Sequence, residues 1–218
     1  MHILIVGAGA VGAVLGDCLV KSNNGSSSDN RVTFLVKDQH VAPLRKTGIR
    51  LTHLPLFPPP ILRLSSPATR PFTNFSLLSL TDLKTKSATD LALHDIDFII
   101  STLPSDAVNG PWLPELCKFF TNNDSSSSSS SSSSKAPAFI VLSPGVKDIE
   151  LVWKVYPRDR VFKGTIAFIS WTAPLPRAIK TSSPASSSIE YVLPPTSMVF
   201  QGPASDMKPL CRALSNGG

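Results

Sequence analysis

The sequence predicts an α/β fold with a doubly wound, mostly parallel sheet and antiparallel strands at its edge. Strand-like and helix-like segments alternate through the first 50 residues, an order typical of parallel sheets whose strands are joined by helices. Short apolar segments followed by helical patterns recur later in the chain. A glycine-rich motif also lies between the first strand and the first helix, where folds of this kind bind ligands.

The first twenty residues predict a buried strand and a helix. Residues 3–6 are a continuous apolar run that ends at Gly7, as in a short strand covered on both faces. Apolar residues then recur at positions 11, 14, 15, 18 and 19, the spacing of a helix with one core-facing stripe. Because Asp17 interrupts the apolar series and no cleavage site follows, neither a membrane span nor a signal peptide is expected.

The next part of the chain continues the alternation and then becomes difficult to interpret. A polar loop is expected over residues 22–30, a second strand over 31–36, and a short helix over 40–48 that ends at Gly48. Residues 55–76 hold too many prolines for central strands. Residues 49–54 and 61–66 are therefore expected to be edge strands on either side of a loop.

The remaining elements follow the same patterns of apolar spacing. Buried strands are predicted over 97–104 and 139–143, and a helix is expected after each, over 107–120 and 144–157. Residues 160–173 are expected to form one long strand, 188–195 and 197–202 an antiparallel pair, and 204–218 a closing helix. The ten serines at 125–134, within the polar segment 122–135, predict a disordered insertion in a surface loop.

Composition restricts the classes of partner. Hydrophobic residues make up 42% of the 218 residues and charged residues 17%, which indicates a globular chain. The net charge of +6 comes from scattered basic residues, so nucleic acid is not favoured, whereas an anionic small molecule is. Cys18, Cys117 and Cys211 show neither metal-ligand nor disulfide spacing. We therefore expect no metal site and a reducing, cytoplasmic compartment.

The glycine-rich motif predicts a dinucleotide site. Its six residues, of the pattern G-x-G-x-x-G, are Gly7, Ala8, Gly9, Ala10, Val11 and Gly12. The first glycine permits a tight turn, the second lets a pyrophosphate approach the backbone, and the third lets the helix pack closely on the strand. The free N–H groups at the start of the helix then face the phosphates. The alternative is a turn that is rich in glycine for packing alone.

The end of the second predicted strand bears on the choice of dinucleotide. An NAD site usually has an acidic residue there, and an NADP site a cation for the 2′-phosphate. Lys37 directly follows the strand and favours NADP, whereas Asp38 would favour NAD if it turned inward. We expect NADP (NADPH). The alternative for Lys37 is a solvated surface lysine.

Further ligand positions are expected where later strands end. Thr102, Leu103 and Pro104 follow one predicted strand, and Ser143, Pro144 and Gly145 end the next. The prolines expose carbonyl groups but bring no proton donor, and they would equally serve to terminate the strands. The histidines are scattered and no acid–base set is evident, so no catalytic residue is assigned.

Several segments together resemble a known family. "MHILIVGAGAVGAVLGDCLV" and "VTFLVKDQHVAPLRKTGIRL" are similar to the N-terminal domain of the ketopantoate reductases (2-dehydropantoate 2-reductases). The similarity continues in pattern through "DIDFIISTLPSDAV", "FIVLSPGVKDIELVWKVYPRDRVFKGTIAFIS" and "FQGPASDMKPLCRAL". The resemblance implies an NADPH-binding Rossmann domain over residues 1–218, with Lys37 at the 2′-phosphate. It also implies hydride transfer to a 2-keto acid, 2-dehydropantoate, which gives a 2-hydroxy acid in pantothenate biosynthesis.

The sequence departs from the family pattern at three points. Pro104 stands where the family has a lysine, and Pro144-Gly145 where it has Asn-Gly. The family's general-acid lysine and substrate-binding carboxylate belong to a C-terminal helical domain, which we expect to be absent from residues 1–218. Three functions stay open: a reductase whose catalytic lobe is missing, a non-catalytic NADP-binding sensor or interaction module, and another Rossmann dehydrogenase with a different 2-keto acid. We expect a small-molecule partner, neither nucleic acid nor membrane, and allow for a homodimer.

Overall fold

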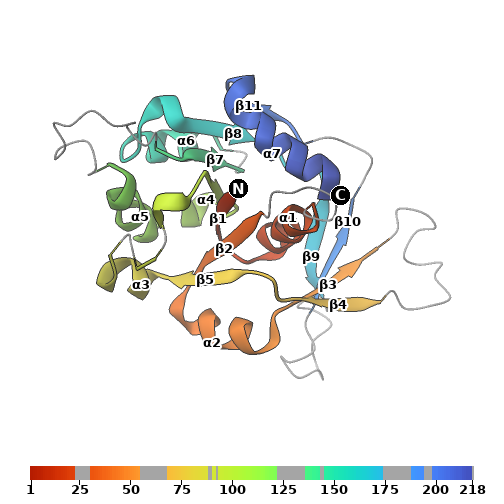
Figure 1. Cartoon of the computed structure of the whole chain (residues 1–218). Coiled ribbons are helices and arrows are strands. Elements are labelled where there is room, and N and C mark those ends of the chain that lie inside the picture. The colour runs from red at the N-terminus through yellow and green to blue at the C-terminus, as the bar shows by residue number, and fades with distance from the viewer. Residues whose placement is uncertain are drawn as a thin grey trace.

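The computed structural model shows two sheets, which helices separate and cover (Figure 1). The residues that it describes are 1–22, 30–54, 68–87, 90–91, 93–121, 136–142, 145–173, 188–193 and 198–217. The predicted serine-rich insertion, most of the polar loop over 22–30, the strand expected over 61–66, and Pro144 lie outside these ranges.

The larger sheet has seven strands in the order β11-β8-β7-β6-β1-β2-β5. All neighbours are parallel except β11, which pairs antiparallel with β8 at the edge. The strands are β1 (His2–Val6), β2 (Arg31–Val36), β5 (Ser76–Ser79), β6 (Phe98–Ser101), β7 (Ala138–Val141), β8 (Val161–Gly164) and β11 (Phe200–Gln201). The chain proceeds outward from β1 in both directions, so the order of strands reverses between β1 and β6. Ligands of doubly wound sheets bind at such a reversal. The order and directions of these strands confirm the predicted fold class.

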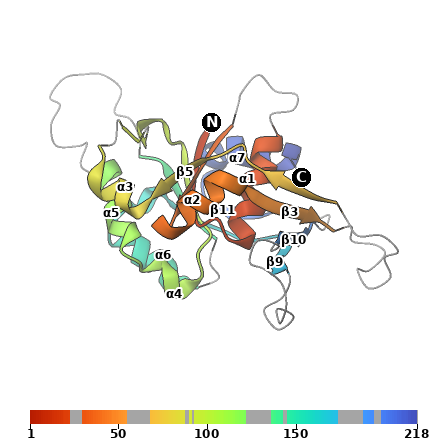
Figure 2. The same cartoon turned by 90° about the horizontal axis from the view of Figure 1, so that it is seen from below.

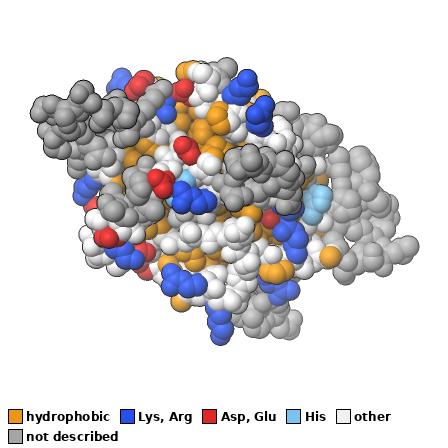
Figure 3. All heavy atoms as spheres, in the orientation of Figure 1, with side chains coloured by type: hydrophobic (Ala, Val, Ile, Leu, Met, Phe, Trp, Pro, Cys, Tyr) orange, Lys and Arg blue, Asp and Glu red, His pale blue; other side chains and the backbone are white. Residues whose placement is uncertain are grey.

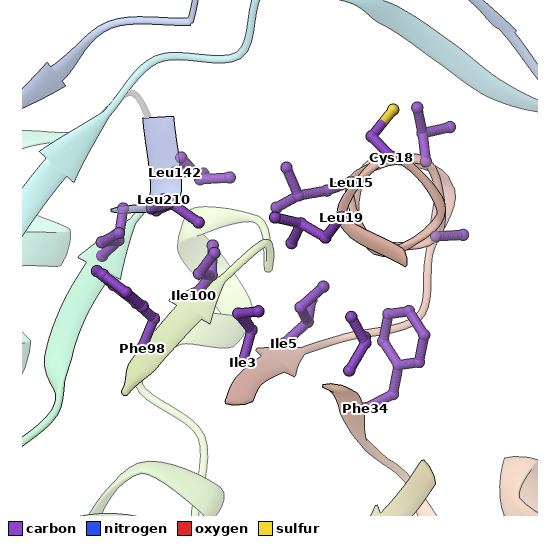
Figure 4. Packing of buried hydrophobic residues seen from close by; sticks show 14 of the residues in the cluster. Ile3, Ile5, Leu15, Cys18, Leu19, Phe34, Phe98, Ile100, Leu142 and Leu210 are labelled. Atoms are coloured by element: carbon purple, nitrogen blue, oxygen red, sulfur yellow. The ribbon is translucent and has the colours of Figure 1, made fainter. Parts of the chain in front are cut away.

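Helices cover both faces of this sheet (Figures 1 and 2). One face carries α1 (Ala10–Lys21) and α7 (Ala204–Gly217), and the other carries α3 (Leu80–Thr85), α4 (Ser105–Val108), α5 (Trp112–Thr121) and α6 (Val146–Trp153). Side chains alternate along β1, because successive residues of a strand point to opposite faces. Ile3 and Ile5 point toward Leu15 and Leu19 of α1 (Figure 4), whereas Leu4 joins the cluster on the other face.

The smaller sheet has the order β4-β3-β10-β9 and lies beside α1. Its strands are β4 (Thr69–Phe72), β3 (Ile49–His53), β10 (Ser188–Val192) and β9 (Ile169–Ala173). Asp17 of α1 is buried and forms ion pairs with Arg70 of β4 and with Lys21, the latter at 3.2 Å. A buried carboxylate needs such partners because removal from water penalises its charge. The ion pair between Asp17 and Arg70 thereby joins α1 to the smaller sheet.

Three predictions of strand organisation were wrong. Residues 160–173 form two strands in different sheets, β8 and β9, rather than one long strand. The strands predicted over 188–195 and 197–202 do not pair with each other, since β10 lies between β3 and β9 while β11 pairs with β8. The strand expected at an edge over 49–54 is β3, which lies between β4 and β10. Apolar alternation identifies a strand but carries no information on its partner.

The predicted helix over 107–120 is two helices, α4 and α5, because Gly110 and Pro111 interrupt the pattern. The helix expected over 40–48 is α2 (Asp38–Thr47), which ends at Gly48 with a positive φ of 66°. No helix within the described ranges is long and apolar enough to cross a membrane.

Candidate functional site

The glycine motif forms the turn from β1 into α1, at the reversal of strand order. Gly7 has a φ of 99°, which L-residues with a side chain rarely adopt. Its N–H donates to the Leu35 carbonyl at 3.0 Å. A Cβ atom on Gly7 would lie 2.9 Å from Leu103 Cδ2, so the turn also packs against the loop that follows β6. Both observations require glycine at this position.

The second and third glycines of the motif have opposite surroundings. A Cβ atom on Gly12 would lie 2.0 Å from the Gly7 carbonyl oxygen and 2.8 Å from Thr102 Oγ1, so α1 packs directly on the turn. A Cβ atom on Gly9 would meet no atom within 4 Å. Packing alone therefore accounts for Gly12 but not for Gly9, whose lack of a side chain leaves the space over the turn open.

The N-terminus of α1 opens into the same space. Gly9 is its N-cap, without a side-chain hydrogen bond, and the first turn contains no acidic residue. The first helical bond is from the Ala13 N–H to the Gly9 carbonyl at 2.9 Å. The N–H groups of Ala10, Val11 and Gly12 precede it and have no carbonyl within the helix to bind. Such an end attracts anions, because its N–H groups carry partial positive charge.

The loop after β6 lies against the turn. The Thr102 N–H donates to the Val6 carbonyl at 3.1 Å, and the Leu103 side chain contacts the position of Gly7. Pro104 is the N-cap of α4 and is exposed. Of the predicted positions here, Leu103 is thus brought to the glycine turn, and Pro104 continues the same loop away from β6.

The loop after β7 is joined to the loop after β6 by a hydrogen bond between side chains. Gly145 is the N-cap of α6, and Asp148 lies buried in the first turn of that helix. Ser105 Oγ donates to Asp148 Oδ2 at 2.8 Å. A Cβ atom on Gly145 would lie 2.5 Å from the same carboxylate oxygen, so Gly145 packs against this contact. Gly145 therefore adjoins α4, one loop away from the glycine turn.

Lys37 and Asp38 follow β2 and have different neighbours. Lys37 is the exposed N-cap of α2. Asp38 Oδ1 accepts a hydrogen bond from the Thr81 N–H at 3.4 Å, and hydrogen bonds from Ser79 and then Thr81 lower the pKa of its carboxyl. Ser79 ends β5, which flanks β2 on the side opposite to β1. Asp38 is thus held toward β5 and away from the glycine turn.

Other parts of the described chain are less suited to a dinucleotide or a metal. A cavity of about 940 Å³ is lined by His2, Arg31, Thr33 and Ser76 at the amino ends of the strands, the edge opposite to the glycine turn. The described residues contain no group of three or more His, Cys, Asp or Glu able to hold a metal ion. Lys and Arg side chains are spread over the face shown in Figure 3 rather than gathered on one element.

Sequence reasoning placed Thr102 at a strand end but did not identify its contacts, and it missed Ser79, Ser105 and Asp148. Thr102 Oγ1 lies 3.0 Å from the Val6 oxygen and 3.2 Å from the Gly7 oxygen. In doubly wound sheets the strand that follows the reversal of strand order lies beside β1. This rule places β6, and therefore Thr102 at its end, next to the glycine turn, and it is the signal that could have identified Thr102.

Comparison with protein families gives one match. Residues 3–103 match the family described as ketopantoate reductase PanE/ApbA. No curated protein matches the chain.

Solved structures share the fold at low sequence identity. The 2-dehydropantoate 2-reductase from Geobacter metallireducens GS-15 matches with a TM-score of 0.61 and 15% identity, over 100% of this chain and 56% of that one. The corresponding enzyme from Porphyromonas gingivalis W83 matches with a TM-score of 0.54 and 14% identity, over 100% and 62%. D-Mandelate dehydrogenase, solved with NADH and anilino(oxo)acetate, matches with a TM-score of 0.61 and 15% identity, over 100% and 55%. The chain thus spans little more than half the length of these proteins.

Proposed function

We propose that residues 1–218 are an NADPH-binding domain of a 2-keto acid reductase, because residues 3–103 match the family described as ketopantoate reductase PanE/ApbA. The observation that carries this proposal is the open space over Gly9, beside a helix N-terminus without a side-chain cap. The pyrophosphate would lie in that space, against the N–H groups of residues 8–12. The D-mandelate dehydrogenase structure, which contains NADH, supports a dinucleotide on this fold.

Lys37 and Asp38 favour NADPH over NADH. The exposed Lys37 follows the strand next to β1, where a cation can meet a 2′-phosphate. The hydrogen bond from Thr81 draws the Asp38 carboxylate toward the β5 side, so this side chain would have to turn before it could approach a ribose 2′-hydroxyl beside β1. The arrangement therefore favours the phosphorylated cofactor on both counts.

The nicotinamide half would extend along the loops that contain Leu103, Pro104 and Gly145, and Pro144 is proposed for the same region. When bound, NADPH supplies a hydride to the carbonyl carbon of the 2-keto acid, and a proton on the oxygen completes the 2-hydroxy acid. Leu103, Pro104 and Gly145 have no acidic group for that proton. Their role would be to position the cofactor, and 2-dehydropantoate is proposed as the substrate from the family.

The thiols are consistent with a reducing, cytoplasmic compartment. Cys18 and Cys117 are buried thiols, and burial raises their pKa values to about 11 and about 12. Such thiols stay protonated at neutral pH and react slowly.

Calorimetric titration with NADPH and NADH tests the proposal. The unsubstituted chain is expected to bind NADPH more tightly. Lys37→Ala should weaken NADPH binding by about 1–3 kcal/mol, the range for hydrogen bonds to charged groups, and leave NADH binding unchanged. Lys46→Ala is the matched control, because Lys46 is an exposed lysine at the other end of the same helix. Equal affinity for both cofactors, or equal loss of both in Lys37→Ala, would contradict the choice of NADPH.

A second candidate is a non-catalytic NADPH-binding module. It is favoured by Pro104, which brings no cationic side chain to a position where the family has a lysine. Both candidates require NADPH binding, so the discriminating measurement is oxidation of NADPH in the presence of 2-dehydropantoate. Substrate-dependent oxidation by this chain, or by a longer product of the same gene, would exclude the non-catalytic module.

A further inference from the structure

The Thr102 hydroxyl lies beneath the glycine turn and contacts two of its carbonyl groups. Its Oγ1 is 3.0 Å from the Val6 oxygen and 3.2 Å from the Gly7 oxygen, so its single proton is shared between them. The same oxygen would be 2.8 Å from a Cβ atom on Gly12. Thr102 therefore occupies the junction of β1, β6 and α1.

This contact determines how the peptide between Gly7 and Ala8 is turned. In a planar trans peptide the carbonyl oxygen and the following N–H point in opposite directions. The Gly7 oxygen points inward, since it accepts from Thr102 and a Cβ on Gly12 would be only 2.0 Å away. The Ala8 N–H then points away from Thr102. Gly9, the next residue of the turn, is exposed and leaves open space.

We propose that Thr102 is a positioning residue that holds the Gly7–Ala8 peptide so that the Ala8 N–H is directed at the pyrophosphate of a bound dinucleotide. The inference rests on the proposed function and adds to it a side chain outside the glycine motif. Glycine at position 7 makes the contact necessary, because a residue without a side chain can adopt several peptide orientations at low cost. A hydroxyl that donates to the Gly7 carbonyl selects one of them.

The backbone around Thr102 is held independently of its hydroxyl. The Thr102 N–H donates to the Val6 carbonyl, and the Leu142 N–H donates to the Ser101 carbonyl at 3.0 Å. Thr102→Val keeps the shape and the β-branched backbone preference of threonine and replaces the hydroxyl with a methyl group, which cannot donate a hydrogen bond. This variant is therefore expected to fold, with one donor missing under the turn.

The test compares Thr102→Val and Thr102→Ser with the unsubstituted chain by calorimetric titration. Thr102→Val should weaken NADPH and NADH by the same factor, about tenfold, which corresponds to about 1.4 kcal/mol, because both contain the pyrophosphate. Thr102→Ser keeps the hydroxyl and should stay within about twofold of the unsubstituted chain. Adenosine 2′-monophosphate, which has no pyrophosphate, should bind all three forms equally.

A second measurement follows the Ala8 amide directly. In an NMR titration with NADPH, the Ala8 N–H signal of the unsubstituted chain should shift strongly, and in Thr102→Val this shift should be reduced more than those of other amides in the turn. Unchanged NADPH affinity in Thr102→Val would overturn the inference alone. Parallel loss of NADPH and adenosine 2′-monophosphate would also overturn it, since that result indicates general damage. Failure of the unsubstituted chain to bind either dinucleotide would instead remove the proposed function, and this inference with it.

Discussion

Gly12→Ala tests whether the close packing of α1 on the glycine turn stabilises the fold. The added methyl carbon would lie 2.0 Å from the Gly7 oxygen and 2.8 Å from Thr102 Oγ1. Both neighbours are held in place, the first by a turn with positive φ and the second by the backbone of the loop after β6. Neither is the free end of a flexible side chain, so α1 or the turn itself must move by about 1 Å.

The expected cost follows from three contributions. Overpacking of this kind costs about 1–3 kcal/mol. Displacement of the Gly7 carbonyl from Thr102 loses a hydrogen bond worth about 0.5–1.5 kcal/mol. Alanine is a better helix former than glycine and recovers at most about 1 kcal/mol. We therefore expect the free energy of unfolding to fall by about 2 kcal/mol, equivalent to a lower melting temperature by about 4–8 °C for a chain of this size.

Urea unfolding followed by circular dichroism measures this change. The titrations should be performed without cofactor, so that stability is separated from binding. Gly9→Ala serves as the control, because it adds the same methyl group, three residues away, where no atom lies within 4 Å. An unfolding free energy for Gly12→Ala within about 0.5 kcal/mol of the unsubstituted chain would show that the turn yields easily and would refute the packing argument.

Two further predictions concern Gly9 and His2. Gly9→Ala should lower the unfolding free energy by no more than about 1 kcal/mol, the cost of alanine at an N-cap. It should weaken both NADPH and NADH by calorimetry, since its methyl group enters the space proposed for the pyrophosphate; unchanged affinity would count against that placement. His2 is buried, and burial followed by the charge of Arg31 lowers its pKa below the ordinary 6.5. The folded state then binds fewer protons than the unfolded state below pH 6.5, so its stability falls as the pH falls. In His2→Gln the unfolding free energy, measured by urea titration at pH values above the titration of carboxylates, should fall less steeply as the pH falls. If the unfolding free energies of the two proteins change with pH in the same way, His2 is not the source of the pH dependence.

The start of the chain was predictable because its signals are local. The apolar run of β1, the spacing of the stripe on α1 and the glycine motif all lie within residues 3–19. β5 and α3 were missed, although their junction carries a local signal as well. Ser79 accepts a hydrogen bond from the Asp82 N–H at 3.1 Å, and Asp82 accepts one from the Ser79 N–H at 3.0 Å. Together these bonds form a capping box, which the sequence Ser-Leu-Thr-Asp indicates.

Strand pairing was less predictable because it depends on distant parts of the chain. β10 pairs with β3, from which it is separated by more than half of the sequence, and with β9. Residues 165–168 take the chain from the larger sheet to the smaller one, yet strand-forming residues occur on both sides of them. Alternation and β-propensity are the same for either partner, and burial in the complete fold decides between them.

The role of each motif residue could not be read from spacing either, because a packing turn and a phosphate-binding turn both favour glycine. Their difference lies in what surrounds each Cβ position. Gly12 is enclosed by Gly7 and Thr102, whereas Gly9 faces open space. A turn in which glycine serves packing alone would tolerate a methyl group at Gly9, while a ligand site would not. The contrast between these two glycines, rather than the presence of the motif, is therefore the main structural support for the proposal that the turn binds a dinucleotide.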